Sequence, residues 1–182
     1  KVVVNGRSIS TNTEKFYIIF HKPDGVITTT DKKSTNTVMD YVKPGVRVFP
    51  VGRLDVGSSG LLLLTNDGSI VNKILKSENK MEKEYLVTLE KSVRPEDVQS
   101  LRDGVKLDGR KTLPATVEKV GSKKLNIILV QGLNRQIRRM CKKLGYDVTK
   151  LERIRVGSLR LDDLPPGQWR FLTEQEIKTL PV

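Results

Sequence analysis

The stretch VFPVGRLDVGSSGLLLLTNDG, residues 48–68, places a glycine- and serine-rich loop between two apolar runs, the second of which is Leu61–Leu64. Apolar runs this short, bounded by glycine, are typical of buried strands. One carboxylate, Asp55, stands between an arginine and this loop. Rigid scaffolds commonly hold catalytic side chains at such loops. A second interpretation stays open, because an aspartate in a turn also caps that turn or pairs with a neighbour, here Arg53.

Segments further along the chain predict more strands. Tyr85, Val87 and Leu89 alternate with residues of the opposite face, which predicts a strand. Residues 112–120 and 124–130 predict a hairpin joined at a Gly-Ser pair. Many strands with interspersed helices that do not alternate regularly indicate an α+β fold with a largely antiparallel or mixed sheet.

Residues 134–144 form the clearest predicted helix. Its apolar positions recur at i, i+3, i+4 and i+7 and form one stripe: Ile137, Met140, Cys141 and Leu144. Asn134 is the predicted N-cap and Gly145 the C-terminal stop. Arg138 borders the stripe, about 100° of helix rotation from Ile137. Its side chain is therefore expected to be partly buried, with the guanidinium directed into a cleft.

The charge of the chain points to a polyanionic partner. Its 182 residues carry a net charge of +12, with a pI near 9.9. Between Gln131 and Arg160 there are nine Lys or Arg and two Asp or Glu, so this segment alone contributes +7. An excess of this sign favours nucleic acid as the partner, although a basic surface also keeps a protein soluble.

The rare residues argue against several kinds of site. Cys141 is the only cysteine, which excludes an internal disulfide and favours a reducing compartment, the cytoplasm. His21 is the only histidine, and without a Cys/His cluster no metal site is expected. No apolar run approaches the length of a membrane span, so no membrane partner is expected. The chain begins at Lys1 rather than Met, which suggests a piece of a longer protein.

Four motifs in order resemble those of the RsuA family of pseudouridine synthases, which includes the RluB, RluE and RluF types. They are HKPDGVITT (21–29), GRLDVGSSGLLLLTNDG (52–68), EKEYLV (82–87) and GLNRQIRRM (132–140). The matches span residues 16–172, and the last motif most resembles the RluF type, which acts on large-subunit ribosomal RNA. The resemblance implies the pseudouridine synthase fold: a bent mixed sheet with flanking helices and a central RNA-binding cleft.

The same resemblance suggests a division of the chain. Residues 1–10 resemble the last hairpin of an S4-like RNA-binding domain, residues 11–15 are a linker, and residues 16–182 form the catalytic domain. The implied activity is isomerisation of a uridine in 23S ribosomal RNA, with tRNA as an open second substrate. The enzyme is expected to be a monomer that needs no cofactor, and the sequence contains neither a Walker P-loop nor a dinucleotide-binding glycine motif.

By resemblance, Asp55 is the catalytic carboxylate. It attacks C1′ of the uridine, attacks C6, or removes the C2′ proton, and the sequence leaves these three routes open. Each route needs ionised Asp55, and a cation would offset its desolvation. Arg138 is the first candidate, with Arg53 as a second. A phosphate contact is the alternative role for Arg138.

The remaining site residues follow from the same motifs. Tyr85 is the stacking platform for the flipped base, or a core tyrosine, or both. Val156 and Leu54 are predicted to enclose the uracil, and the HKPDG motif to have a structural role beneath it. Six basic residues either bind backbone phosphates or form a solvated face: Arg135, Arg139, Lys142, Lys143, Arg153 and Arg155.

Two alternative functions stay open. A non-catalytic RNA-binding or ribosome-assembly protein would explain the charge equally well. It would leave Asp55, Tyr85 and Arg138 together without a reason. A nucleoside hydrolase is less favoured, because glycosidases usually use two carboxylates and the GRLD motif supplies one.

Overall fold

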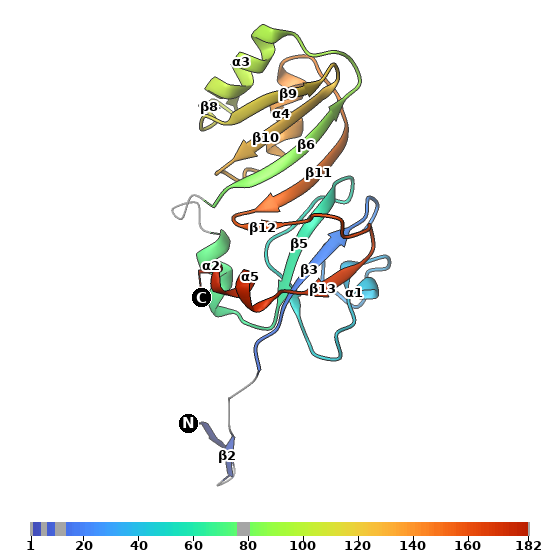
Figure 1. Cartoon of the computed structure of the whole chain (residues 1–182), viewed down its shortest axis with the longest axis vertical. Helices are drawn as coiled ribbons and strands as arrows, with labels where there is room; N and C mark the ends of the chain where they lie inside the picture. Colours follow the sequence, from blue (N-terminus) through green and yellow to red (C-terminus); the bar gives the residue numbers. More distant parts are fainter. Residues whose placement is uncertain (1, 5–6, 10–13, 76–80, 182) are drawn as a thin grey trace.

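The computed structural model describes residues 2–4, 7–9, 14–75 and 81–181 (Figure 1). Strands β1 (Val2–Val4) and β2 (Arg7–Ile9) pair antiparallel, as the predicted hairpin requires. Residues 10–13, which include most of the predicted linker, lie outside the described residues. The assignment of residues 1–10 to an S4-like domain stays a prediction.

The main body is a mixed sheet of nine strands, as the predicted α+β class requires (Figure 1). The strands on its main path have the order β13-β3-β5-β11-β6-β10-β9, and every neighbouring pair is antiparallel except β5 and β11. The strands are β3 (Tyr17–Lys22), β4 (Phe49–Pro50), β5 (Ser59–Thr65), β6 (Lys83–Leu89), β9 (Thr116–Gly121), β10 (Lys124–Leu129), β11 (Val148–Val156), β12 (Leu159–Arg160) and β13 (Trp169–Phe171).

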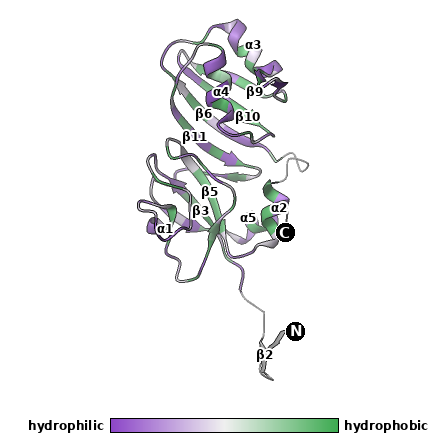
Figure 2. Ribbon diagram, turned by 180° about the vertical axis from the view of Figure 1, so that it is seen from behind, coloured by the Kyte–Doolittle hydropathy of each residue, from purple (hydrophilic) through white to green (hydrophobic). Residues whose placement is uncertain are grey.

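Short helices flank this sheet, and a separate two-stranded hairpin, β7 (Lys106–Leu107) and β8 (Arg110–Lys111), lies outside it. The helices are α1 (Val38–Tyr41), α2 (Ser69–Leu75), α3 (Pro95–Asp103), α4 (Gln136–Lys143) and α5 (Glu174–Lys178). Helices α3 and α4 lie with β6, β9 and β10 in one lobe (Figures 1 and 2). Helices α1, α2 and α5 lie with β3 and β5 in the other. Within the described residues, none of the helices is long and apolar enough to cross a membrane.

Strand β5 is buried on both faces, which explains the unbroken apolar run that predicted it. Leu61 and Leu63 pack with α2 in one apolar cluster, and Leu62 and Leu64 pack with Phe20 in another. Figure 2 shows apolar residues along β3 and β5. A strand that is covered on both faces does not alternate between apolar and polar residues. The unbroken apolar run is therefore typical of a central strand.

The two lobes meet where β5 runs parallel to β11. Only two residue pairs join these strands, Ser59 with Glu152 and Gly60 with Arg153. Gly60 has φ +111°, and a Cβ on it would clash with the carbonyl oxygen of Arg153. Glycine is therefore needed here for both backbone conformation and close strand approach. The narrow junction leaves room for a cleft between the lobes.

Gly60→Ala is expected to destabilise the protein strongly. The backbone conformation alone costs roughly 1–3 kcal/mol for a non-glycine residue, and the added methyl group would also force β5 away from β11. Gly45→Ala is the matched control, because Gly45 also has positive φ but has nothing within 4 Å of an added Cβ. Thermal unfolding of both variants measures the difference. Equal melting temperatures would show that the junction tolerates separation.

Candidate active site

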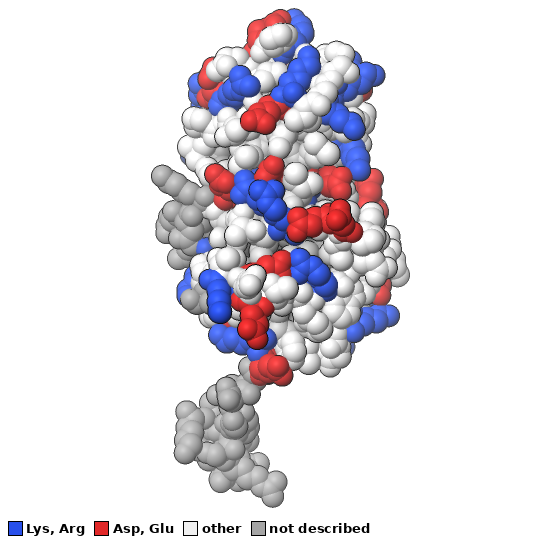
Figure 3. All heavy atoms as spheres, in the orientation of Figure 1, with Lys and Arg blue, Asp and Glu red and all other residues white. Residues whose placement is uncertain are grey.

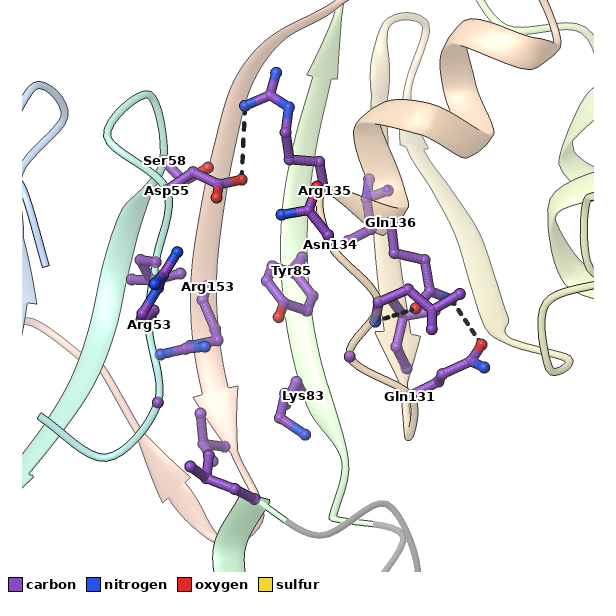
Figure 4. Close-up of a pocket in the computed structure, with 18 of the residues that line it drawn as sticks. Arg53, Asp55, Ser58, Lys83, Tyr85, Gln131, Asn134, Arg135, Gln136 and Arg153 are labelled. Carbon is purple, nitrogen blue, oxygen red and sulfur yellow. Dashed lines mark hydrogen bonds and ion pairs between the residues drawn. The ribbon is translucent and has the colours of Figure 1, made fainter. Parts of the chain in front are cut away.

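A cavity of about 620 Å³ opens beside the β5–β11 junction (Figure 4). Its wall comes from three parts of the chain: the loop before β5, the strands β6 and β11, and the segment that leads into α4. The ionisable residues that line it are Arg53, Asp55, Lys83, Tyr85, Arg135 and Arg153. Asp55 is the one carboxylate among these described lining residues, and four of the others are cationic.

Asp55 lies in the loop between β4 and β5, as predicted. Its side chain is 34% exposed, and Oδ2 lies 3.7 Å from Nη1 of Arg135 (Figure 4). The loop is held by its main chain, because the Leu54 carbonyl accepts a hydrogen bond from the Thr28 hydroxyl at 2.8 Å. The amide of Ser58 donates to the Asp55 carbonyl at 3.1 Å. The carboxylate is therefore free to contact a ligand while its backbone is anchored.

The ion-pair partner of Asp55 in the structure is Arg135, whereas Arg138, the first predicted partner, makes no ion pair with Asp55 among the described residues. Arg138 is partly buried as expected, but its guanidinium donates to main-chain carbonyls, at 2.8 Å to Val148 and also to Gly57. Its Nε is buried without a hydrogen-bond partner in the described chain. The Arg138 side chain thus holds the β4–β5 loop by a contact with the loop's main chain at Gly57. Arg53, the second predicted support, is exposed and lines the cavity without an ion pair to Asp55 among the described residues.

A residue in the left-handed conformation at the start of α4 explains why Arg135, and not Arg138, pairs with Asp55. Arg135, rather than Asn134, is the N-cap, with φ 47° and ψ 35°. The preceding turn is closed by Gln136, whose buried side-chain oxygen accepts from the Leu133 amide at 3.1 Å. This turn places the Arg135 side chain across the cavity from the β4–β5 loop (Figure 4).

Lys22 contacts the main chain of the β4–β5 loop and gives the HKPDG motif its structural role. Its buried ammonium donates to the carbonyls of Pro23 at 2.8 Å, Val26 at 2.7 Å and Val56 at 3.4 Å. Burial lowers the pKa of Lys22 to about 8, although Asp24 and Asp55 favour its charged form. Because Val56 directly follows Asp55, this lysine ties the loop to β3. His21 contacts the Leu164 carbonyl at 2.7 Å, which agrees with a structural role.

The predicted base-binding residues come together at this cavity. Tyr85 projects from β6, is partly buried, and packs against the apolar cluster that contains Val87. Leu54 and Val156 are both buried and both line the cavity. Tyr85 thus packs against the core and also borders the cavity, a position that suits a core role and a stacking role alike. The roles of these residues toward uracil stay predictions.

Four of the six predicted phosphate-binding residues lie at α4. Arg139 pairs with Asp108, and Lys142 pairs with Asp147 at 2.9 Å. Lys143 is exposed, and Arg135 combines 51% side-chain exposure with its contact to Asp55. These residues keep charge at the surface beside the cavity.

The other two, Arg153 and Arg155, are not the exposed phosphate contacts that the sequence predicted. Arg153 is only 6% exposed and lines the cavity, with its Nε donating to the Leu61 carbonyl at 2.8 Å. Arg155 has a 12% exposed side chain that pairs with Glu82 and Glu84. Figure 3 shows acidic and basic side chains interspersed on the face it presents.

Lys83 is the functional candidate that the sequence interpretation missed. It lines the cavity beside Tyr85 (Figure 4), and its Nζ donates to the Met81 carbonyl at 3.2 Å. Burial, with the nearby charge of Arg153, lowers its pKa. The strand period could have identified it, because Lys83 lies two residues before Tyr85 and so shares its face. No group of three or more His, Cys, Asp or Glu in the described part of the chain could hold a metal ion.

The chain is similar in sequence to known RNA pseudouridine synthases. Residues 16–143 match the sequence profile described as RNA pseudouridylate synthase. The dual-specificity RNA pseudouridine synthase RluF of Salmonella typhi is 45% identical over 97% of this chain and 62% of its own length. The ribosomal large subunit pseudouridine synthase B of Bacillus subtilis is 35% identical over 99% of this chain and 77% of its own.

A solved structure agrees with the sequence matches. The crystal structure of a pseudouridylate synthase superposes with a TM-score of 0.86 at 31% identity, covering 94% of this chain and 76% of that one. This likeness confirms the fold expected from the four motifs. The chain spans about three fifths of the length of the RluF relative.

Proposed function

The chain belongs to the RNA pseudouridylate synthase family, and on that premise we propose that it isomerises a uridine in RNA to pseudouridine. Asp55 is the essential carboxylate of this proposal. The reaction breaks the N1–C1′ bond of uridine, rotates the uracil and rejoins it to C1′ through C5. It needs a carboxylate beside the sugar and a pocket that holds the detached base.

One observation carries the proposal: Asp55 is the carboxylate of a described cavity that also contains Tyr85, Leu54 and Val156. An aromatic ring contributes about 1–3 kcal/mol when a base stacks on it, which offsets part of the cost of flipping the uridine out of its stack. The buried Leu54 and Val156 provide apolar surface for the uracil ring. A non-catalytic RNA-binding protein would not need this combination.

The proposed substrate is the large-subunit ribosomal RNA. One relative is named as a ribosomal large subunit enzyme and another as a dual-specificity RNA enzyme, so transfer RNA is the second RNA to test. We further propose that the protein acts as a monomer in the cytoplasm. Size-exclusion chromatography with light scattering would test the monomer.

The decisive experiment is to incubate the protein with in vitro transcripts of bacterial 23S ribosomal RNA and of tRNA, and then map pseudouridine at single-nucleotide resolution. We expect conversion at a defined uridine of the ribosomal transcript. Tight binding of both RNAs without any pseudouridine would favour the non-catalytic alternative. Release of free uracil would favour a hydrolase.

RNA binding is expected to weaken steeply with salt, because Lys and Arg contacts release counterions from the phosphates. Reversing charge at Arg139 and Lys143 should weaken binding and flatten the plot of log affinity against log salt by about one unit per lost contact. Lys178→Glu is the control for each reversal, because Lys178 is exposed on α5 in the other lobe. Unchanged affinity and slope in the α4 variants would show that this basic face is only solvated.

A further inference from the structure

Two neighbouring strands present side chains to the cavity, Lys83 and Tyr85 from β6 and Leu151, Arg153 and Val156 from β11. The backbone register of β6 and β11 places Tyr85 opposite Arg153 and Lys83 opposite Val156. An irregularity in this register lies between Arg153 and Arg155. It lets Arg153 and Val156, three positions apart, both line the cavity, which a regular strand would not allow. This wall therefore combines one aromatic and two aliphatic side chains with two cations.

The two cations of this wall have no carboxylate partner in the described part of the chain. Arg153 is 6% exposed and donates through Nε to the Leu61 carbonyl. Lys83 donates to the Met81 carbonyl. The two charges also oppose each other, since Arg153 contributes to lowering the pKa of Lys83. Placing like charges together and away from water is unfavourable without a compensating anion, so the arrangement suits a negatively charged ligand.

Lys83 and Arg153 are more buried than the other two cations of the cavity wall, Arg53 and Arg135, which lie at its exposed rim. Arg53 is exposed and the Arg135 side chain is 51% exposed, which suits contacts with solvated phosphates. Arg153 is almost fully buried and Lys83 is partly buried. A flipped nucleotide enters a pocket with its base first. The deeper pair thus faces the base, while phosphates remain at the rim.

We propose that Lys83 and Arg153 donate hydrogen bonds to the uracil ring and stabilise the negative charge that develops on it during isomerisation. This inference rests on the proposed function. If Asp55 attacks C1′, or removes the C2′ proton, the electron pair of the N1–C1′ bond leaves with the uracil, which becomes an anion shared by N1, O2 and O4. If Asp55 adds to C6, the electron pair of the C5–C6 double bond moves to give an enolate at O4.

All three routes therefore place negative charge on the ring. In the first two, bond formation between C5 and C1′ consumes this charge. In the third, C5 attacks C1′ as the N1–C1′ bond breaks, the electron pair passes to N1, and Asp55 leaves C6 as the C5–C6 double bond re-forms. In every route N1 finally gains a proton and C5 loses one. Fixed donors in a partly dehydrated site stabilise such charge without reorganising during the reaction. The expected role is catalytic and independent of which route Asp55 follows. It also predicts that the two residues contribute little to ground-state binding of RNA.

The test compares Lys83→Met, which removes the charge but keeps the length, with Lys83→Arg, which restores a cationic donor. Lys124→Met is the control, because Lys124 is exposed on the adjacent strand β10. Single-turnover rates at saturating RNA are measured on the 23S transcript, alongside RNA dissociation constants and thermal melting. We expect Lys83→Met to lower the rate by about 10²–10³-fold, with affinity within about threefold of wild type, and Lys83→Arg to recover most of the rate.

Three results would overturn the inference. A Lys83→Met enzyme with wild-type single-turnover rate would show that the charge is not used in catalysis. Weakened binding with a normal rate at saturation would assign Lys83 to a phosphate instead. Equal rate losses in Lys83→Arg and Lys83→Met, with matching losses of melting temperature, would show a structural role. Failure of the wild-type protein to form pseudouridine would instead overturn the proposed function itself.

Discussion

Asp55→Asn is expected to abolish pseudouridine formation while leaving the fold and RNA affinity largely intact. The amide has nearly the same shape but can neither act as a nucleophile nor accept the C2′ proton. No other described residue of the cavity wall supplies a carboxylate. Product formation on the 23S transcript measures the loss. Activity within about tenfold of wild type, equivalent to only about 1.4 kcal/mol of barrier, would reject an essential role.

The stability of this variant should change little, for a reason visible in the site. The Asp55 side chain is 34% exposed and its ion pair with Arg135 is long, at 3.7 Å. Exposed ion pairs contribute about 0–1 kcal/mol. Asp147→Asn is the matched control, because it removes the same charge from a surface ion pair with Lys142. It should melt near the wild-type temperature and retain full turnover.

Tyr85→Ala is expected to lose turnover almost completely, beyond what its loss of stability explains. Deleting a fully buried aromatic side chain costs about 3–5 kcal/mol, and Tyr85 is only partly buried, so a smaller loss is expected. The measurement is single-turnover rate at a temperature where melting curves show the variant folded. A variant that is destabilised but turns over normally when folded would show that Tyr85 serves only the core.

Tyr85→Phe separates stacking from a role of the hydroxyl group. Phenylalanine keeps the ring face, so RNA binding should remain, and turnover should fall clearly if the hydroxyl transfers a proton. Tyr146→Phe is the control, because Tyr146 belongs to the apolar cluster against which Tyr85 packs, and its buried hydroxyl donates to Asp97 at 2.6 Å. That substitution should lower stability and leave turnover unchanged. Full turnover in Tyr85→Phe would limit Tyr85 to stacking.

Strands and helices whose apolar residues repeat at a regular spacing were predictable from the sequence. The apolar run Leu61–Leu64 became the central strand β5, and the stripe through Ile137 became the buried face of α4. The period of two placed Tyr85 with Val87 against one cluster. These succeed because burial of a repeating apolar face determines helix and strand alike. The motifs around Asp55 and Tyr85 likewise indicated the chemistry through family resemblance.

The charge partners inside the site were decided by tertiary structure alone. A left-handed turn brings Arg135, not Arg138, to Asp55. A register irregularity in β11 lets Val156 line the cavity together with Arg153, while Arg155 pairs with Glu84 of β6 and with Glu82 just before that strand. Local spacing shows which face a side chain occupies, but pairing depends on how distant segments approach each other. The long cationic side chains are most affected, because a small rotation of the backbone moves a guanidinium from a phosphate contact to a buried site.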